Sequence, residues 1–427
     1  MQGQPLPMLL YRLFIWLYPK AVWLLSFSNS KAKAWLKGRR KLFQKLAAAF
    51  HKNTAAVIWM HCSSLGEFEQ GLPVLESLKQ HYPSHRILVT FFSPSGYEVR
   101  KKHPAADHVF YLPMDSPSHA HRFLNIVQPV LAIFVKYEFW YYYLQETRQR
   151  NIPLLLASGI FREDQVFFRW YGGVHRRMLS FFSVLFVQNQ ESLQLLQTIG
   201  ITGNAMLAGD TRFDRVMEIA SEFEPVLPVE AFCGDFQTIV AGSTWTDDDE
   251  ELDHFSNTHP DTRFLVAPHD ISAERLDECL KLYRHSMLYS SYLLTYRTDP
   301  RPAGINTLII DNMGMLSRLY RYATVCYVGG GFGDDGIHNI LEPAVYGKPV
   351  LFGPVYDKYF EADELIEAGG AFSVENALEL EAYLTELLTD TTRCKKAGRA
   401  AADYTRQKAG ATGKILRWIQ ENRLLMI

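Results

Sequence analysis

The stretch VCYVGGGFGDDGIHNILEPAVYGKPVLFGP, residues 325–354, decides the fold of this chain. The apolar, β-branched run 323–328 predicts a buried strand, and the glycines after it predict a turn. A helix-like segment then opens near His338, and Lys348–Phe352 predicts the next strand. The stretch is therefore a βαβ unit of a parallel sheet. Its glycines and helix start favour the close approach of an anion, so it predicts a phosphate site.

The spacing Gly331-x-Gly333-x-x-Gly336 also matches the fingerprint of dinucleotide-binding domains. That fingerprint normally occupies the first βα turn of its domain. Here it lies about three quarters along the chain, after several predicted βα units. A nicotinamide or flavin enzyme is therefore the weaker alternative.

Length and charge predict two domains behind a basic arm. The 427 residues are 48% apolar and 13% aromatic, which is ample for two large cores. The net charge of −2 hides an asymmetry, since ten Lys and Arg residues but no Asp or Glu precede Glu67. Such a basic, aromatic-rich arm suits an anionic surface, either a membrane or a nucleic acid.

The segment Leu6–Phe27 is the most hydrophobic part of the chain. Arg12, Pro19 and Lys20 interrupt it, so an interfacial amphipathic helix fits at least as well as a spanning helix. The other alternative is a helix packed on the protein itself. No small-residue cleavage site follows, which argues against a secretory signal peptide.

Cysteine and acid patterns predict no metal centre. The five cysteines are scattered without CxxC spacing, which indicates reduced thiols in the cytosol. Residues 247–251 are consecutive acids, but on a helix they point in different directions. We interpret them as acids at a helix N-terminus.

Three small-residue loops follow strands of the first domain. Glu67 begins a helix after the strand 57–60, and the helix start should hold its carboxylate ionised. Ser95 and Glu138 follow two later strands. Because ligands bind beyond the carboxyl ends of parallel strands, these residues could converge on one cleft. Each carboxylate could instead be a helix cap or a surface group.

The segment 161–177 is rich in aromatic residues and arginine. It could be a lip for an anionic, partly apolar acceptor, or an ordinary packed helix with solvated arginines. The predicted organisation is an apolar and basic arm (1–52), an N-terminal Rossmann-like domain (53–221), a linker, a C-terminal Rossmann-like domain (230–404) and a helix (405–427) that packs back toward the N-terminal domain.

Several short motifs occur in order along the chain: Trp59-x-His61, Ser64-x-Gly66-Glu67, 90–96, Tyr111-Leu-Pro-x-Asp115, Glu138-x-Trp140, Gly242-Ser-Thr, Asp311-x-Met-Gly314, His338-Asn339-x-x-Glu342-Pro343, Gly347-Lys-Pro-Val and Phe352-Gly-Pro354. As an ordered set they resemble the 3-deoxy-D-manno-octulosonate (Kdo) transferases of lipopolysaccharide synthesis. The resemblance implies a GT-B fold: two Rossmann-like α/β domains facing a central cleft, with an N-terminal membrane-associating helix.

The resemblance also implies an activity. Such an enzyme is an inverting glycosyltransferase that moves Kdo from CMP-Kdo to the lipid A precursor, lipid IVA. It needs no metal or other cofactor and has no nucleic-acid partner. It works on the cytoplasmic face of the inner membrane, where the anionic surface attracts the basic arm.

Site residues carry over by position. The resemblance makes Glu67 the general base and places Glu138 near the acceptor or the Kdo carboxylate, where it would need to be protonated. On the donor side it implies Gly242, Ser243, His269, Met313, Gly314, Gly330, His338, Asn339 and Glu342. On the acceptor side it implies Ser64, Gly66, Ser95, Gly96 and Arg212.

One departure from the family concerns the donor phosphate. The family usually has an Arg-His pair where this chain has His269-Asp270, so an arginine is either missing or supplied by Arg275. Two other functions stay open. One is a GT-B enzyme with a UDP- or GDP-sugar donor, and the other is a membrane- or nucleic-acid-binding module with inert clefts.

Overall fold

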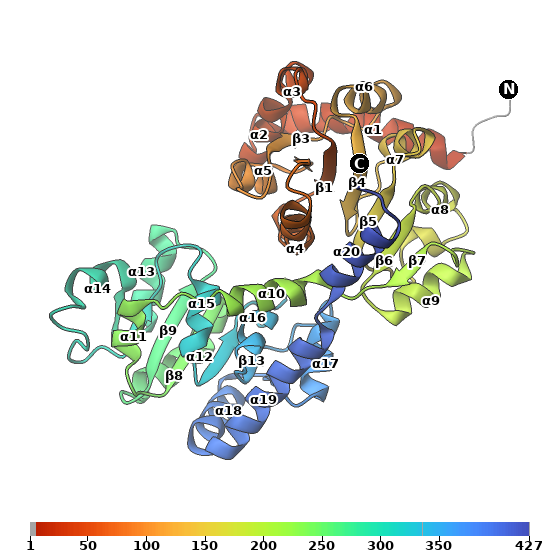
Figure 1. Ribbon diagram of the computed structural model, residues 1–427. Helices are drawn as coiled ribbons and strands as arrows, with labels where there is room; N and C mark the ends of the chain where they lie inside the picture. The colour runs from red at the N-terminus through yellow and green to blue at the C-terminus, as the bar shows by residue number, and fades with distance from the viewer. Residues whose placement is uncertain (1–5, 335, 427) are drawn as a thin grey trace. The chain divides into compact units, whose positions relative to one another are not determined.

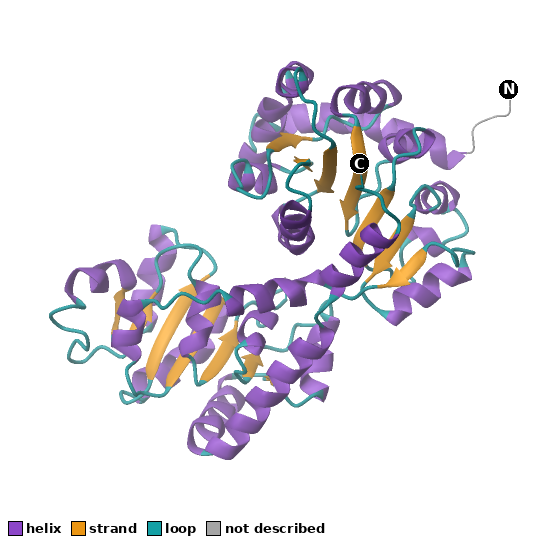
Figure 2. Ribbon diagram, in the orientation of Figure 1, coloured by secondary structure: helices purple, strands orange, loops and turns teal. Residues whose placement is uncertain are grey.

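The structure is a computed structural model that describes residues 6–334 and 336–426. The chain divides into two compact units, here called unit 1 and unit 2. Unit 1 contains the described residues up to Arg215 together with those from Ala409 onward, and unit 2 contains Val216–Lys408. In each unit, helices flank a parallel sheet (Figure 1; Figure 2).

The sheet of unit 1 has the strand order β3-β2-β1-β4-β5-β6-β7. Every neighbouring pair is parallel. The order reverses between β1 and β4, which makes this the topological switch point of the sheet. The strands are β1 (Val57–Cys62), β2 (Arg86–Phe91), β3 (His108–Tyr111), β4 (Pro129–Val135), β5 (Leu154–Gly159), β6 (Val184–Val187) and β7 (Ala205–Leu207).

Helices bury both faces of this sheet, as a parallel sheet requires. The helical segments are α1 (Leu6–Leu25), α2 (Ser30–Arg39), α3 (Leu42–Phe50), α4 (Leu65–His81), α5 (Pro94–Arg100), α6 (Pro117–Val127), α7 (Tyr141–Gln149), η1 (Val166–Phe168), α8 (Gly173–Leu179), α9 (Gln190–Thr198) and α20 (Ala411–Glu421). A further helix, α10 (Thr211–Ser221), begins in unit 1 and ends in unit 2. Successive residues of β1 point to opposite cores: Trp59 packs with α3, α6 and α7, whereas Met60 packs with α4 and α20.

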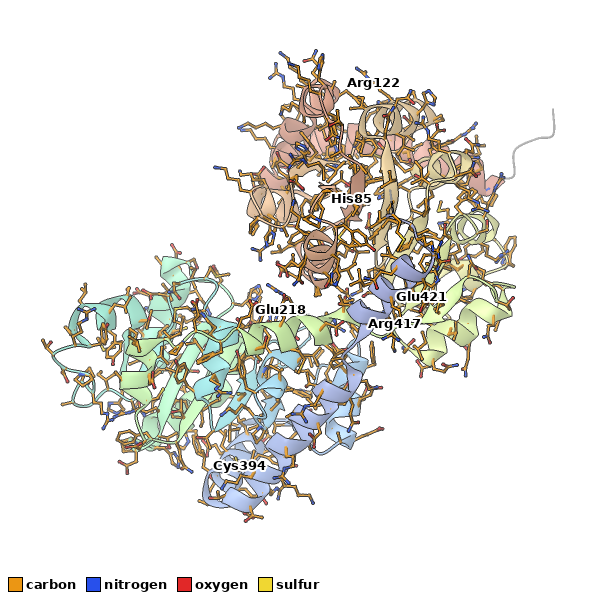
Figure 3. All side chains as sticks on the ribbon, in the orientation of Figure 1. His85, Arg122, Glu218, Cys394, Arg417 and Glu421 are labelled. Carbon is orange, nitrogen blue, oxygen red and sulfur yellow. The ribbon has the colours of Figure 1, made fainter. Side chains whose placement is uncertain are left out.

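The last helix belongs to the core of unit 1. Ile415 and Ile419 of α20 are fully buried in the same cluster as Leu72 of α4. Arg417 and Glu421, labelled in Figure 3, lie on the same helix. The two ends of the sequence thus build one hydrophobic core.

The first helix is both anchored and exposed. Tyr11 Oη donates a 2.5 Å hydrogen bond to the buried Asp115, and Arg12 Nε donates to Tyr142 Oη at 2.8 Å. Burial raises the pKa of Asp115 to about 6. The other side of the helix exposes apolar residues, among them Leu9, Leu13, Trp16 and Leu17. Among the described helices, Pro7–Leu25 alone is long and apolar enough to cross a membrane.

The sheet of unit 2 has the order β10-β11-β9-β8-β12-β13-β14 and is again entirely parallel. Its switch point lies between β8 and β12. The strands are β8 (Thr238–Thr244), β9 (Arg263–Pro268), β10 (Ser286–Leu288), β11 (Thr307–Ile309), β12 (Val325–Val328), β13 (Val350–Phe352) and β14 (Ala371–Ser373).

Helices also cover this second sheet. They are α11 (Leu227–Cys233), α12 (Thr246–Thr258), α13 (Ala273–Leu282), α14 (Tyr289–Thr295), α15 (Leu316–Leu319), η2 (Tyr320–Tyr322), α16 (Leu341–Val345), α17 (Phe360–Glu367), α18 (Ala377–Thr389) and α19 (Thr391–Lys408). One core cluster joins Ile239 and Tyr327 of the central strands to Leu252 of α12 and Leu384 of α18. Two units of this kind confirm the α/β prediction.

Candidate active site

Several of the expected site residues lie at the two switch points. In unit 1, Glu67 follows β1 and Glu138 follows β4, the two strands at which the order reverses. In unit 2, Gly242 and Ser243 lie near the end of β8, and Gly330 and His338 follow β12. Ligands of open α/β sheets bind at such crevices. Each unit therefore has one candidate site of its own.

Glu67 caps the helix on which it lies. It is the third residue of α4, and its Oε2 accepts the Ser64 N–H at 2.8 Å while Ser64 Oγ lies 3.2 Å away. This reciprocal capping box fixes the carboxylate beside the turn that precedes the helix. One side of the site is open: a side-chain carbon built on the exposed Gly66 would meet no atom within 4 Å.

The hydrogen bonds at the helix start favour the ionised form of Glu67, as expected, but they are not the largest influence on its pKa. Burial and the charge of Glu138 raise the pKa of Glu67, and the two hydrogen bonds from Ser64 oppose this shift only in part. A carboxylate whose pKa is raised toward neutral pH is a better proton acceptor than an ordinary one. The surroundings of Glu67 therefore favour proton uptake by this carboxylate.

Glu138 is held by ring nitrogens of two side chains. Its side chain is nearly buried, and its Oε2 lies 2.6 Å from Trp140 Nε1 and 3.0 Å from His61 Nε2. His61 Nδ1 lies 2.8 Å from Thr90 Oγ1, which accepts the indole N–H of Trp59 at 2.8 Å. Glu138 Oε2 therefore accepts the indole N–H of Trp140 and forms a second hydrogen bond with the imidazole ring of His61.

The remaining acceptor-side residues lie around these carboxylates. Gly96 is at the loop after β2, where any side chain would overlap the Phe91 ring and press on the backbone of Ser64. Ser95 Oγ lies 3.0 Å from Ser93 Oγ. Arg212 Nε donates to Asp210 at 2.7 Å. Arg212 also lowers the pKa of Tyr137, which Glu67 raises, so all three share one electrostatic neighbourhood.

On the donor side, a buried aspartate joins the two loops of the switch point. Asp248 Oδ2 accepts the N–H of Trp245 and that of Gly330, both at 2.8 Å, and Tyr327 donates to its Oδ1 at 2.7 Å. Gly330 has a φ of 95°, which a side chain would strain. Asp248 thus pins the glycine turn after β12 to the end of β8.

The backbone at the end of β8 is shaped for close approach. A side chain at Gly242 would overlap the Tyr320 hydroxyl, and Ser243 adopts a left-handed φ of 56°. A non-glycine residue in this region is uncommon and concentrates at functional sites. The predicted donor loop therefore has the strained geometry of a ligand-binding turn.

Three aromatic rings stack beside this turn. The ring centroids of Trp245 and His269 are 4.5 Å apart, as are those of His269 and His338, and the interplanar angles are 24° and 21°. The structure therefore brings His269 and His338 together. Trp245 completes the stack and is partly exposed, so the stack offers a flat aromatic face to a ligand.

Two further donor-side expectations concern the helix after the glycines and the loop after β11. The helix after the glycines is short, Leu341–Val345, and Asn339 Oδ1 accepts the Leu341 N–H at 3.2 Å. Asn339 Nδ2 donates to Glu342 Oε1 at 3.1 Å, so these two predicted residues do lie together. Met313 and Gly314 follow β11, and Met313 is 73% exposed. Because β9 lies between β11 and β8, these two residues are not on a strand next to β8.

Arg275 does not replace the family's phosphate-binding arginine. Its guanidinium is buried and ion-paired with Asp249 and Glu278, and Asp249 also accepts from Tyr283 at 2.8 Å. The acids 247–251 thus do more than favour a helix start, since Asp248 and Asp249 each hold a buried network. No group of three or more His, Cys, Asp or Glu side chains among the described residues could hold a metal ion.

The sequence analysis does not identify the residues that orient the predicted site residues. His61 and Trp140 were quoted only as parts of motifs, and Trp245 and Asp248 were not singled out as site residues. A signal existed for His61 and Trp140, because each lies at the carboxyl end of a strand that carries a predicted carboxylate. Nothing in the sequence distinguishes Asp248 from the other acids of the run 247–251.

Comparison with known proteins agrees with this geometry. Residues 37–215 match the family described as 3-Deoxy-D-manno-octulosonic-acid transferase (kdotransferase). A 3-deoxy-D-manno-octulosonic acid transferase of Aquifex aeolicus is 29% identical over 349 residues, covering 79% of this chain and 88% of the relative. One from Haemophilus influenzae is 28% identical, covering 84% and 85%.

Solved structures with the same architecture are more distant in sequence. UDP-GlcNAc 2-epimerase from Neisseria meningitidis superposes with a TM-score of 0.62 at 14% identity, covering 86% of this chain and all of the other. MurG of Acinetobacter baumannii gives 0.54 at 12% identity, covering 86% and 99%. These likenesses confirm the GT-B fold. The match over residues 37–215 and the two relatives make this chain similar to the 3-deoxy-D-manno-octulosonic acid (Kdo) transferases.

Proposed function

We propose that this protein transfers Kdo from CMP-Kdo to a hydroxyl group of the lipid A precursor with inversion at the anomeric carbon. The observation that carries this proposal is Glu67, a carboxylate with a raised pKa that is fixed at the switch point of unit 1. An inverting displacement needs one base on the acceptor side, and Glu67 has the position and basicity for that role.

In the proposed mechanism, unit 1 holds the acceptor. Glu67 takes the proton of the attacking hydroxyl group while its oxygen forms the bond to C2 of Kdo. Glu138, held by His61 and Trp140, accepts a hydrogen bond from the acceptor sugar. We assign Ser64, Gly66, Ser95, Gly96 and Arg212 to the surroundings of that sugar.

Unit 2 is proposed to hold the donor. The turn formed by Gly242, Ser243 and Gly330 receives the CMP phosphate, which leaves as an anion. His269 and His338 are proposed to contact the nucleotide, and Glu342 its ribose hydroxyls, with Asn339 holding Glu342 in place. Met313 and Gly314 are assigned to the donor-side rim.

The leaving group needs no metal in this proposal, because a phosphate monoester is already a stable anion. The helix Pro7–Leu25 and the basic residues that follow it would keep the enzyme on the cytoplasmic face of the inner membrane. That surface contains the lipid acceptor.

Incubation with CMP-Kdo and lipid IVA tests the proposal. We expect CMP release and a glycolipid heavier by at least one Kdo unit, with EDTA making no difference. The Glu67→Gln variant should lose nearly all turnover and still bind CMP. Inactivity of the wild-type protein in this assay, with transfer from a UDP- or GDP-sugar instead, would overturn it.

A further inference from the structure

A large cavity of unit 1 leads away from Glu138. Its volume is about 1000 Å³, at the upper end of the roughly 300–1,000 Å³ typical of ligand pockets. It lies between three segments: the first helix, the loop after β4, and residues 165–175. The mechanism described above uses only its edge, at Glu138.

The walls of this cavity are aliphatic and aromatic. Leu10 and Phe14 come from α1, Phe139 follows β4, and Phe167 and Trp170 come from the third segment. Polar side chains are few, and Glu138 is one of them. A pocket with apolar walls and a few polar groups fits a ligand that has a polar part and a long apolar part.

The helix that forms one wall also has an exposed apolar side. Leu9, Leu13, Trp16 and Leu17 are each at least 45% exposed, and the rim residue Trp170 is 91% exposed. Tryptophan at the edge of an apolar surface is typical of the membrane interface. An apolar chain could therefore pass from a bilayer into the cavity without crossing water.

Charged side chains of both signs border the polar end. Burial raises the pKa of Tyr137, which lines the cavity beside Glu138; the charges of Arg162 and Arg212 oppose that rise, and those of Asp164 and Glu67 add to it. Arg212 is itself ion-paired with Asp210. The polar end therefore suits a hydrated head group, and the apolar walls and membrane access suit an acyl chain.

We propose that this cavity binds one fatty acyl chain of the acceptor glycolipid and so directs the acceptor sugar toward Glu67 and Glu138. The inference rests on the proposed function, because it places the acceptor on unit 1. It adds that the enzyme recognises its acceptor by an acyl chain as well as by its sugar.

Gly173 gives a direct test, because it lines the cavity and a side-chain carbon there would meet no atom within 4 Å. Gly173→Phe should therefore fill the cavity without displacing the fold. We expect its KM for lipid IVA to rise at least tenfold, while kcat/KM for the fully deacylated, water-soluble acceptor stays within twofold of wild type. Equal losses on both acceptors, or none on either, would overturn the proposal.

Gly203→Phe is the matched control. Gly203 also has nothing within 4 Å of a built side-chain carbon, but it lies in the loop before β7 and does not line the cavity. This variant should behave as wild type with both acceptors. A KM increase equal to that of Gly173→Phe would assign the effect to added bulk and contradict an acyl site.

A binding assay separates failure of this inference from failure of the proposed function. Wild-type protein should bind cis-parinaric acid, and saturated fatty acids of eight, ten and twelve carbons should displace it with affinities that rise about tenfold per two methylenes. In the Gly173→Phe variant, the affinity should depend much less on the length of the fatty acid. If the wild-type protein binds the probe but transfers Kdo to neither acceptor, the proposed function is contradicted and the acyl site is supported. Absence of probe binding, or equal displacement by acceptor-free phospholipid vesicles, would overturn the acyl site.

Discussion

His61 Nε2 lies 3.0 Å from Glu138 Oε2, and the imidazole ring is completely buried. The contact joins the ends of β1 and β4 at the switch point of unit 1. His61 Nδ1 lies 2.8 Å from Thr90 Oγ1 and 3.0 Å from the Thr90 carbonyl oxygen, so both ring nitrogens are held in place. His61 is a positioning residue for the Glu138 carboxylate.

Replacing His61 by alanine should lower kcat by about 10²-fold, because Glu138 loses a hydrogen-bond partner and can shift from its position. KM for CMP-Kdo should not change, since we propose that the donor binds unit 2. His61→Gln, whose amide can donate at a similar reach, should recover part of the loss. Steady-state kinetics with each variant check this.

His85→Ala controls for the loss of a buried imidazole. His85 is also buried, but it directly precedes β2 and so lies at the amino end of that strand, whereas the switch-point loops follow the carboxyl ends. Its kcat should remain near wild type. A kcat loss as large as that of His61→Ala would show that both effects reflect general destabilisation.

The raised pKa of Glu67 predicts the acidic limb of the pH profile. A base must be deprotonated, so kcat/KM should fall as the pH drops through a midpoint above 4.5, the ordinary value for this carboxyl group. Glu138→Gln removes the repulsion that raises this pKa, so the midpoint should move to lower pH. Glu69→Gln, on the same helix, should leave the midpoint in place. A midpoint that stays the same in Glu138→Gln would contradict the electrostatic effect of Glu138 on the pKa of Glu67.

The stacked rings of unit 2 predict how CMP binding depends on Trp245. Trp245→Ala should raise the Kd for CMP about tenfold, as stacking of a base on an aromatic ring is worth roughly 1–3 kcal/mol. Trp245→Phe should retain most of the affinity. Titration calorimetry measures both. Trp170→Ala removes an exposed tryptophan from unit 1 and should leave CMP binding as it is.

The anchor of α1 predicts a pH-dependent stability loss. Tyr11→Phe removes a hydrogen bond to the buried Asp115 and should cost about 1–3 kcal/mol in urea unfolding. Because burial raises the pKa of Asp115 to about 6, this carboxyl group favours the folded state less as the pH rises through 6. The loss in free energy of unfolding caused by Tyr11→Phe should therefore be larger at pH 8 than at pH 5. Tyr82→Phe should show no such difference.

Much of the fold can be read from the sequence, because central parallel strands are buried on both faces and form long apolar runs. The runs at β1, β4 and β12 are predicted for this reason. The strands β7, β10 and β14 are missed, since each has three residues and lies at a sheet edge. So short a segment has no room for a recognisable alternation.

The site residues on the strand ends are likewise predictable by type and place. What the sequence does not reveal is their partners. Arg275 lies near His269 in the sequence, yet it pairs with Asp249 on another helix. The net pKa of Glu67 also depends on Glu138, which is 71 positions away and becomes its neighbour only through strand pairing.

The contribution of α20 to the core of unit 1 has a consequence for biosynthesis. Ile415 and Ile419 complete that core, but roughly 190 residues of unit 2 are made between Arg215 and this helix. At about 5–20 residues per second, the first unit waits roughly 10–40 s on the ribosome with one face of its sheet only partly covered. Unit 2, whose core is continuous in sequence, can fold during this interval. Unit 2 can therefore complete its own core before α20 completes the core of unit 1.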